Sequence, residues 1–447
     1  MSENKTIPYV SVVMPVFNAE NYIFDVIDKI RKQTLKELEI IIVDDGSTDD
    51  TKNILERIAA EDNRVILLSC ESNGGAGEAR NVGLDYSQGE YIIFFDDDDF
   101  VDENLLEKAY LKAKAHDADV VVFRSQYYNL QTQSRMSTPW TIRSDLLPKK
   151  DVFPSTDIKL DFFSAFVWWP WDKMLKRDKI VAEGIKFQPI RTSNDLYFIC
   201  AFVLLSERIC ILDEILIDHT VFRKTSLSNT REKSYHCAID ALEALRGLMV
   251  EREIFDARRI DFINYSTVFL EWHLNTLYGA AYFTLYDDIR EYLTGIGAKY
   301  EDFYEDRAKL FFDHLYRLSA DDYLFYLSHR LQNENDELSS ANHDAALAYQ
   351  ALSLNYQDVC ENLKKQEAAT TANCHEREAT GVHLNELQAR LRAHENVILN
   401  KGQQLRAAQE QIEELTHKLR QSERFNGDIT ASLAWRIMSW LGLTKKY

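Results

Sequence analysis

The first 125 residues alternate short runs of β-branched and aromatic residues with longer stretches in which apolar residues recur every three or four positions. The short runs predict buried strands, and the longer stretches predict amphipathic helices. Their alternation is typical of a parallel sheet covered by helices. The predicted strands are 9–15, 38–43, 64–68, 91–95 and 119–123, and the predicted helices are 19–33, 48–60, 77–86 and 102–115.

The remaining chain changes character three times. Residues 126–230 are irregular and aromatic, and residues 231–330 have the Phe, Tyr and Leu content of several packed helices. Beyond residue 331 the composition shifts to Gln, Asn, Glu, Ala and Leu, and Gly and Pro almost vanish. We therefore predict four parts: a sheet domain (1–230), a helical domain (231–330), a coiled coil (331–425) and an amphipathic terminal helix (426–447).

The third part keeps one heptad register of apolar residues. Position d is occupied by Leu331, Leu338, Ala345, Leu352 and Val359, and position a by Tyr349, Tyr356, Leu363, Leu384, Leu391, Ile398, Leu405, Ile412 and Leu419. Such persistence favours a coiled coil that makes a homo-oligomer. One helix over 331–422 would be roughly 140 Å long. Polar residues at Gln366, Thr370, Asn373, Arg377 and Thr380 weaken the seam. A partly disordered tail and folding back onto 231–330 are the alternatives.

The terminal segment 426–447 carries an apolar, Trp-containing pattern followed by Lys445 and Lys446. A helix of this kind can lie in a membrane interface, which would give the protein a peripheral membrane contact. It can equally cap the coiled coil. The segment is too short to span a membrane.

Composition narrows the functional classes. The net charge of −20 argues against nucleic acid as a partner. No run of 18 uncharged apolar residues occurs, and the N-terminus lacks the apolar region of a signal peptide. The six cysteines form no Cys-x-x-Cys pair, which fits reduced thiols that mostly fill the core. We expect a cytoplasmic protein, with the terminal helix as its contact to the inner face of the membrane.

The strand 91–95 is followed directly by four carboxylates, Asp96 to Asp99. Four like charges at the end of a buried strand repel one another and resist desolvation. A divalent cation with oxygen ligands, Mg²⁺ or Mn²⁺, would relieve this repulsion. Ligands of open α/β sheets bind at the carboxyl ends of the strands. The run therefore predicts a metal-diphosphate site. A solvated acidic turn before the helix at Asp102 is the alternative.

Two further motifs follow strand ends. Asp44 and Asp45 precede Gly46-Ser47, where carboxylates can accept hydrogen bonds from a base and a ribose. Ser47 or Asp49 can also cap the next helix, and both roles are compatible. The segment 73–83 is glycine-rich and contains Arg80, which can pair with phosphate.

Together these motifs resemble family-2 glycosyltransferases of the GT-A fold, especially bacterial capsule and O-antigen polysaccharide enzymes. The resemblance covers roughly residues 9–228. Its motifs are Pro-Val-Phe-Asn (15–18), Val-Asp-Asp-Gly-Ser-Thr-Asp (43–49), Asn-Gly-Gly (73–75), Ala-Arg-Asn-Val-Gly-Leu (79–84) and Phe-Asp-Asp-Asp-Asp (95–99). It implies a nucleotide-sugar-binding mixed sheet flanked by helices.

The resemblance also implies roles for individual residues on the donor side. Asp96 and Asp98 correspond to the Asp-x-Asp motif that holds the metal, and Asp45 corresponds to the carboxylate that faces the nucleobase. The residues placed on the nucleotide-sugar side are Pro15, Asn18, Asp44, Asp45, Ser47, Gly75, Arg80, Asp97 and Arg223.

On the acceptor side, Trp171-Asp-Lys173-Met-Leu-Lys-Arg resembles the family's Trp-Asn-Lys-Leu-Tyr-Lys-Arg segment. The resemblance places Trp168, Trp171, Lys173 and Asn194 on this side, although core Trp packing is the ordinary alternative. Asp195 matches the family's general base, with Asn194 where Glu is usual. The competing role for Asp195 is a helix N-terminal carboxylate. His219 lies in a segment that resembles the family's closing strand, where a lone histidine is more often structural than catalytic.

The expected activity is an inverting, metal-dependent transfer of a sugar from a nucleotide-diphosphate sugar, with UDP as the expected nucleotide. The acceptor is expected to be a glycan or a lipid-linked glycan in cell-envelope polysaccharide synthesis. The alternative is a coiled-coil scaffold of a polysaccharide-synthesis complex with a degenerate catalytic domain. A sugar-phosphate nucleotidyltransferase would need a Gly-rich basic loop near the N-terminus, which Pro15 to Asn18 do not provide.

Overall fold

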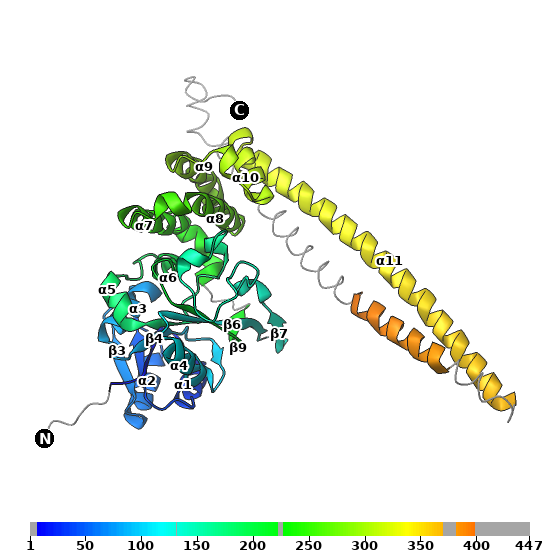
Figure 1. Cartoon of the computed structure of the whole chain (residues 1–447), viewed down its shortest axis with the longest axis horizontal. Helices are drawn as coiled ribbons and strands as arrows, with labels where there is room; N and C mark the ends of the chain where they lie inside the picture. The colour runs from blue at the N-terminus through cyan, green and yellow to red at the C-terminus, as the bar shows by residue number, and fades with distance from the viewer. Residues whose placement is uncertain (1–6, 131, 222–226, 370–380, 398–447) are drawn as a thin grey trace. The chain divides into compact units, whose positions relative to one another are not determined.

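The computed structural model describes residues 7–130, 132–221, 227–369 and 381–397 (Figure 1). The chain divides into two compact units. The first comprises residues 1–277 and 284–313, and the second comprises 278–283 and 314–447. The first unit is an α/β structure with a mixed sheet and helices, and the described part of the second is helical, as the sequence predicts for both.

The sheet of the first unit has the strand order β3-β2-β1-β4-β8-β6-β9-β5, with β7 paired to β6. Strands β1 to β4 are parallel, β8 is antiparallel to β4 and to β6, and β9 is parallel to β6. The bounds are β1 Val10–Val16, β2 Leu38–Asp44, β3 Val65–Ser69, β4 Tyr91–Phe94, β5 Phe100–Val101, β6 Val120–Asn129, β7 Ser134–Ser137, β8 Lys173–Lys176 and β9 Ile209–Val221.

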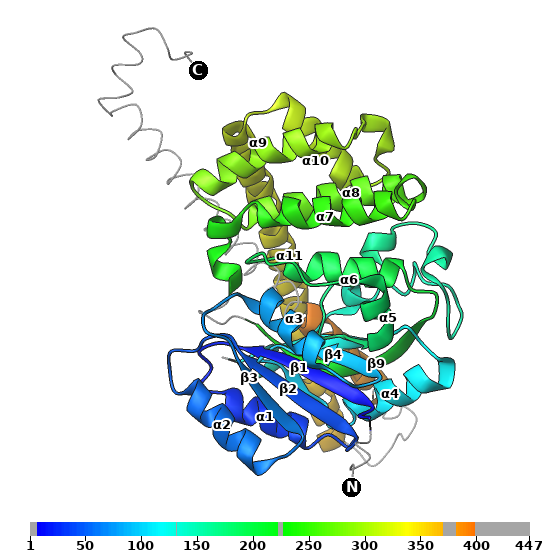
Figure 2. The ribbon, with the colours of Figure 1, turned by 90° about the vertical axis from the view of Figure 1, so that its left-hand side faces the viewer.

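Helices cover both faces of this sheet (Figure 2). α1 (Ile23–Arg31), α2 (Thr51–Glu61) and α4 (Leu105–His116) share one apolar core with alternate residues of β1, β2 and β4. α3 (Ala76–Tyr86), α5 (Arg177–Glu183) and α6 (Asn194–Leu204) belong to the other face. Strands β1, β2 and β4 are buried throughout because they lie between the two helical layers, which explains their mostly apolar sequences.

One glycine sets the approach of α3 to the sheet. A Cβ added at Gly83 would lie 2.4 Å from the side chain of Val13 on β1. Any larger residue would push the helix away from the strand. The glycine of the Ala-Arg-Asn-Val-Gly motif therefore has a packing role, and it helps to fix the position of Arg80 one turn earlier in the helix.

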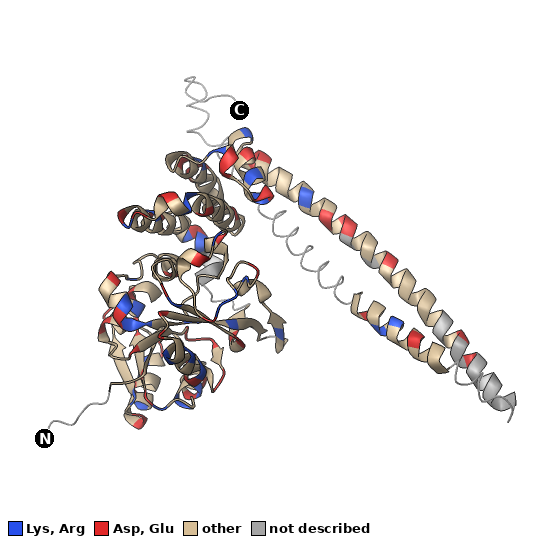
Figure 3. Cartoon of the chain, in the orientation of Figure 1, with Lys and Arg blue, Asp and Glu red and all other residues tan. Residues whose placement is uncertain are grey.

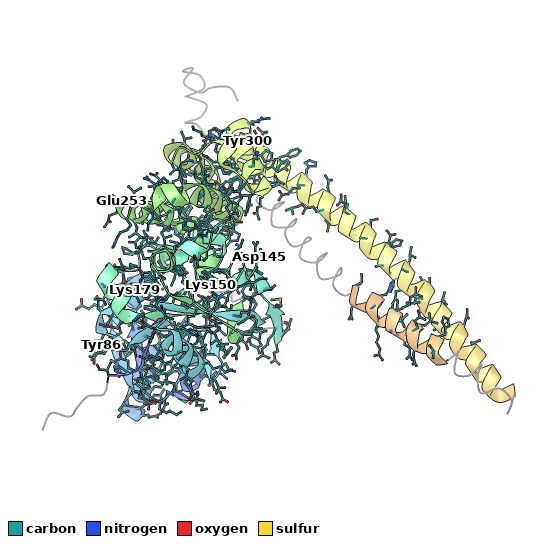
Figure 4. The ribbon with its side chains drawn as sticks, viewed as in Figure 1. Tyr86, Asp145, Lys150, Lys179, Glu253 and Tyr300 are labelled. Atoms are coloured by element: carbon teal, nitrogen blue, oxygen red, sulfur yellow. The ribbon has the colours of Figure 1, made fainter. Side chains whose placement is uncertain are left out.

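The four predicted parallel strands correspond to β1–β4 within one residue at each end. The predicted strand 119–123 is the first half of β6, but β8 separates it from β4. The region 126–230 was predicted as irregular, yet it contains β7, β8 and β9. The strand β9 lacks a period-2 pattern because the register between β6 and β9 shifts at Arg124. The segment 139–166 contains short 3₁₀ turns and isolated bridges at Ile142, Phe153 and Phe166. Its Lys150, which is labelled in Figure 4, donates to Asp157 at 2.7 Å.

The region 231–330 is helical, as predicted, with α7 (Cys237–Glu251), α8 (Phe255–Asn275), α9 (Ala280–Gly295) and α10 (Asp306–Arg317). α8 is joined to the sheet-bearing part of the first unit by buried polar contacts. Arg258 donates to the backbone oxygens of Ser155 and Ile158 at 2.8 and 2.7 Å, and Asp261 accepts from the backbone amide of Asp161. The predicted boundary at residue 230 is therefore crossed by hydrogen bonds.

The second unit contains α11 (Ala320–Ala369) and a further helix over 381–397. These helices lie side by side (Figure 1), and the hydroxyl of Tyr349 donates to Glu395 at 2.9 Å. In one continuous helix, residues 46 positions apart would be separated by about 69 Å. The predicted single helix over 331–422 is therefore wrong. Most of the charged residues that Figure 3 draws along α11 are acidic.

Side-chain exposure in this pair follows the predicted heptads. Leu331, Ala345, Tyr349 and Leu352 are half-buried, although they lie on a helix whose other described residues are mostly exposed. Leu387, at a d position of the facing helix, is 1% exposed. The apolar seam is thus covered within one chain. A coiled coil between chains stays a prediction. Residues 398–447, with the predicted terminal helix and its membrane contact, lie outside the described residues.

Two predictions from composition can be compared with the structure. Cys200, Cys210 and Cys237 are buried and free, as expected of core-filling thiols, whereas Cys70 is half-exposed. Among the described helices, none combines the length and the apolarity needed to cross a membrane.

The ion-pair cluster at the start of β3 yields a stability prediction. Asp62, which is 11% exposed, accepts from both Arg64 and Arg31 and so ties α1 to the turn between α2 and β3. We expect Asp62→Asn to lower the free energy of unfolding by about 1–3 kcal/mol, because charge-assisted hydrogen bonds are lost. Glu61→Gln is the control. Glu61 is 61% exposed, so the change should stay within about 0.5 kcal/mol.

The stability difference between wild type and Asp62→Asn should become smaller as the pH falls. Hydrogen bonding to Arg64 holds the pKa of Asp62 well below its usual range. The carboxylate therefore stabilises the fold above its ordinary pKa, and this contribution is lost as the pH falls through the depressed value. Urea unfolding should show the full difference between wild type and Asp62→Asn at neutral pH and a smaller one in strong acid. Equal stability at neutral pH would contradict the role given to Asp62.

Candidate active site

The acidic run lies where the sequence places it, directly after β4. One oxygen each from Asp96, Asp98 and Asp99 lies within 4.8 Å of the others. Asp96 and Asp98 are half-buried, and Asp99 is 2% exposed. A buried carboxylate in the run excludes a simple solvated turn. Three converging oxygen donors fit a hard divalent cation such as Mg²⁺ or Mn²⁺.

Asp99 is paired with His219. The imidazole Nδ1 lies 2.8 and 3.0 Å from the two carboxylate oxygens, and the backbone amide of Thr220 donates to Asp99 at 3.0 Å. The pairing follows from the topology: β5 pairs antiparallel with β9, and Phe100 faces Asp218, so Asp99 lies beside His219. Burial lowers the pKa of His219, but the Asp99 carboxylate raises it to about 9. The pairing therefore favours the protonated form of the histidine, whose charge opposes that of the run.

Arg80 neutralises a second charge. Its Nη2 donates to Asp96 at 2.6 Å, and its Nη1 donates to the side-chain oxygen of Asn194 at 2.9 Å. The guanidinium is buried and lies over the ring of Phe187, 5.4 Å from its centroid. One side chain thus connects the acidic run to the first residue of α6. Asn194, which stands where the family usually has Glu, is an acceptor for this arginine.

Asp195 occupies the first turn of α6, after Ser193 in a left-handed conformation. Burial raises the pKa of Asp195, although the nearby Arg80 opposes this effect. A raised pKa makes a carboxylate a better proton acceptor. Its position at a helix N-terminus and a role as general base are therefore compatible. The role itself stays a prediction.

The predicted nucleotide-side residues organise the ends of β1 and β2. Asp45 is buried and accepts from the backbone amides of Gly74 and Gly75 at 2.9 and 2.8 Å. Gly75 has φ +90°, which favours glycine. The Ser47 hydroxyl accepts from the Asn18 amide at 3.0 Å. These carboxylate and amide groups hold the glycine loop and the turn after β2 in fixed positions.

The other donor-side residues have different surroundings. The backbone amide of Ser47 donates to Asp44 at 3.2 Å, and Asp97 lies 3.5 Å from the Tyr22 hydroxyl. Pro15 is buried within β1, so its side chain belongs to the core. Arg223 lies outside the described residues.

The predicted acceptor-side residues are mostly interior. Trp168 and Trp171 are 6% and 2% exposed, and the indole of Trp168 donates to the Phe163 oxygen at 2.7 Å. Lys173 is fully buried, and its Nζ donates to the backbone oxygens of Val167 and Trp169 at 2.6 and 3.1 Å. At least one core tryptophan was expected, and two are found. Direct contact between these three side chains and an acceptor would require rearrangement.

Two aromatic residues beside the site, Trp140 and Tyr127, were not singled out in the sequence, whereas Trp169 was, because it stands with Trp168 and Trp171 around Pro170. Trp169 is half-buried and stacks on Trp171, with 4.5 Å between ring centroids. Trp140 and Tyr127 contact Trp169 from the 3₁₀ turn after β7 and from β6. No spacing in the sequence joins these three residues. The only signal for Trp140 and Tyr127 was the aromatic content of the region 126–230.

Comparison with known proteins agrees with the motifs. The family model "Glycosyl transferase family 2" matches residues 11–177. Glycosyltransferase GlyG of Streptococcus pneumoniae serotype 4 is 44% identical over 120 residues, which are 27% of this chain and 39% of GlyG. The uncharacterized glycosyltransferase EpsJ of Bacillus subtilis is 30% identical over 236 residues, which are 52% of this chain and 66% of EpsJ.

The chain thus spans less than two thirds of the length of these relatives. Among solved structures, Staphylococcus aureus TarS 1–349 in complex with UDP-GlcNAc aligns with a TM-score of 0.44 and 19% identity, covering 69% of this chain and 91% of that one. The family match covers β1 to β4, the acidic run and the Trp-Asp-Lys segment. The chain thus contains a region, residues 11–177, that matches the glycosyl transferase family 2 model.

Proposed function

We propose that the chain transfers a sugar from a nucleotide-diphosphate sugar, with UDP as the expected nucleotide, to a hydroxyl of a glycan or lipid-linked glycan of the cell envelope. The observation that carries this proposal is the position of Arg80. Its guanidinium contacts Asp96 of the acidic run and Asn194, the neighbour of Asp195. The candidate metal ligands and the candidate base therefore belong to one connected site.

Each group has a role in a single in-line displacement. Asp195 takes the proton of the acceptor hydroxyl as its oxygen attacks the anomeric carbon from the side opposite the diphosphate, so the anomeric centre inverts. Asp45 holds the loop at Gly74 and Gly75 beside the nucleotide. Asp96 and Asp98 would hold Mg²⁺ or Mn²⁺. Such a cation, when bound, neutralises charge on the leaving diphosphate.

The first test concerns the metal ligands. We expect Asp98→Asn to abolish UDP release from UDP-sugars in the presence of acceptor. Its melting temperature should stay unchanged or rise, because one repelling carboxylate is removed. Excess chelator should abolish wild-type turnover, and added Mg²⁺ or Mn²⁺ should restore it for wild type but not for the variant. Full turnover in excess chelator would refute the metal assignment.

The second test concerns the base. We expect Asp195→Asn to slow transfer by about 100-fold or more, while binding of the nucleotide, measured by calorimetry, is retained. Asp178→Asn is the control, because this aspartate is 88% exposed in the same unit. Because burial raises the pKa of Asp195, the acid limb of the wild-type rate profile should lie above the ordinary carboxyl range. Near-normal turnover of Asp195→Asn would assign the proton to another group.

We also propose that the second unit makes a homo-oligomer. Leu347 and Leu354 lie one heptad apart on α11 and are 52% and 57% exposed, so the helix 381–397 does not cover them. Light scattering of the full chain should give a multiple of 52.0 kDa. Replacing both leucines by Gln should lower the mass, whereas Ala346→Gln, at an exposed neighbour, should not. A wild-type mass of one chain would contradict this proposal.

A further inference from the structure

Three aromatic residues form a cluster next to the acidic run, which we call the aromatic platform: Tyr127, Trp140 and Trp169. The ring centroids of Trp140 and Trp169 are 5.6 Å apart, and Tyr127 lies 5.9 Å from Trp140 and 6.3 Å from Trp169. Trp140 is 45% exposed, and the other two are half-buried. The cluster therefore consists of two half-buried rings and one more exposed indole, that of Trp140.

The platform is continuous with the candidate active site. Trp169 and Tyr127 contact the His219 ring at 5.6 and 5.9 Å, and His219 binds Asp99. Asp99 in turn lies within 4.8 Å of Asp96 and Asp98. A molecule on the platform would thus lie beside the carboxylates that face the donor diphosphate in the proposed reaction.

Hydrogen bonds hold the segment that carries Trp140. The Thr138 hydroxyl donates to the Ser125 oxygen at 2.6 Å in the interior, and the Val167 amide donates to the Thr141 oxygen at 3.0 Å. Arg124 donates to the Ser144 hydroxyl at 2.9 Å. The Trp140 ring is therefore presented from a fixed backbone, which lowers the entropic cost of binding a ligand.

We propose that the aromatic platform binds a sugar ring of the acceptor, with its apolar C–H face stacked on Trp140. This inference rests on the proposed function and names the part of the surface that selects a glycan acceptor. Sugar rings present an apolar face and a polar edge, and indole and phenol rings match both.

The test compares variants of the full chain on a printed array of bacterial capsule and cell-wall oligosaccharides. Wild type should bind a subset of glycans, and Trp140→Ala should bind the same glycans about 10-fold more weakly, the loss typical of an aromatic anchor. Trp140→Phe should retain most of the binding. Trp272→Ala is the matched control, because Trp272 is 44% exposed on α8, outside the platform.

A second readout separates this inference from the proposed function. UDP release from UDP-sugars without acceptor, which is transfer to water, should be equal in wild type and Trp140→Ala. Absence of this activity from wild type with every UDP-sugar would count against the proposed function alone. Equal glycan binding by wild type and Trp140→Ala, or no glycan binding by wild type, would overturn the platform. The platform would also be overturned if Trp140→Ala lost binding to anionic lipid vesicles while its glycan binding equalled that of wild type. That result would assign the surface to a membrane.

Discussion

The repulsion among the carboxylates at the end of β4 is the constraint around which the first unit is arranged. Two like charges 4 Å apart near a protein surface repel by about 4 kcal/mol. Two side chains oppose this repulsion: the guanidinium of Arg80 contacts Asp96, and the imidazole of His219 contacts Asp99. These two partners come from α3 and β9, so the run is tolerated only when helix, acidic turn and distant strand are assembled together.

This assembly explains the sheet order. The short strand β5 directly follows the acidic run and pairs with β9, which brings His219 to Asp99. β9 reaches that position because it is parallel to β6 and lies beyond it in the sheet. On the opposite side of the run, the close packing allowed by Gly83 fixes α3, and with it Arg80. Asp98 lies in the same cluster, with one carboxylate oxygen within 4.8 Å of an oxygen of Asp96 and of Asp99.

Sequence patterns predicted the elements whose burial is uniform. Strands β1, β2 and β4 are buried throughout, so their sequences are mostly apolar, and their ends carry the motifs. The sequence patterns did not predict β9, because its register shift against β6 and its exposed middle residues break the alternation of apolar and polar positions. The heptads of 331–397 placed Leu331, Ala345 and Leu352 at position d, and these side chains are half-buried on a helix that is otherwise mostly exposed. The heptads did not show that α11 packs against the helix 381–397 of the same chain. An apolar seam has the same sequence pattern whether the helix that covers it belongs to another chain or to a later part of the same chain.

The sequence also predicted the residues of the proposed donor side better than the exposed rings of the proposed acceptor side. Donor chemistry needs charge and glycine at strand ends, and these residues stand in short motifs that a sequence displays directly. The acceptor-side motif instead supports a surface from below: Lys173 holds the backbone of Val167 and Trp169, and Trp171 stacks under Trp169. The ring that is open to solvent, Trp140, comes from a segment without periodicity. The buried support and the exposed ring thus come from separate parts of the chain, and neither includes the side chains that contact Asp96 and Asp99.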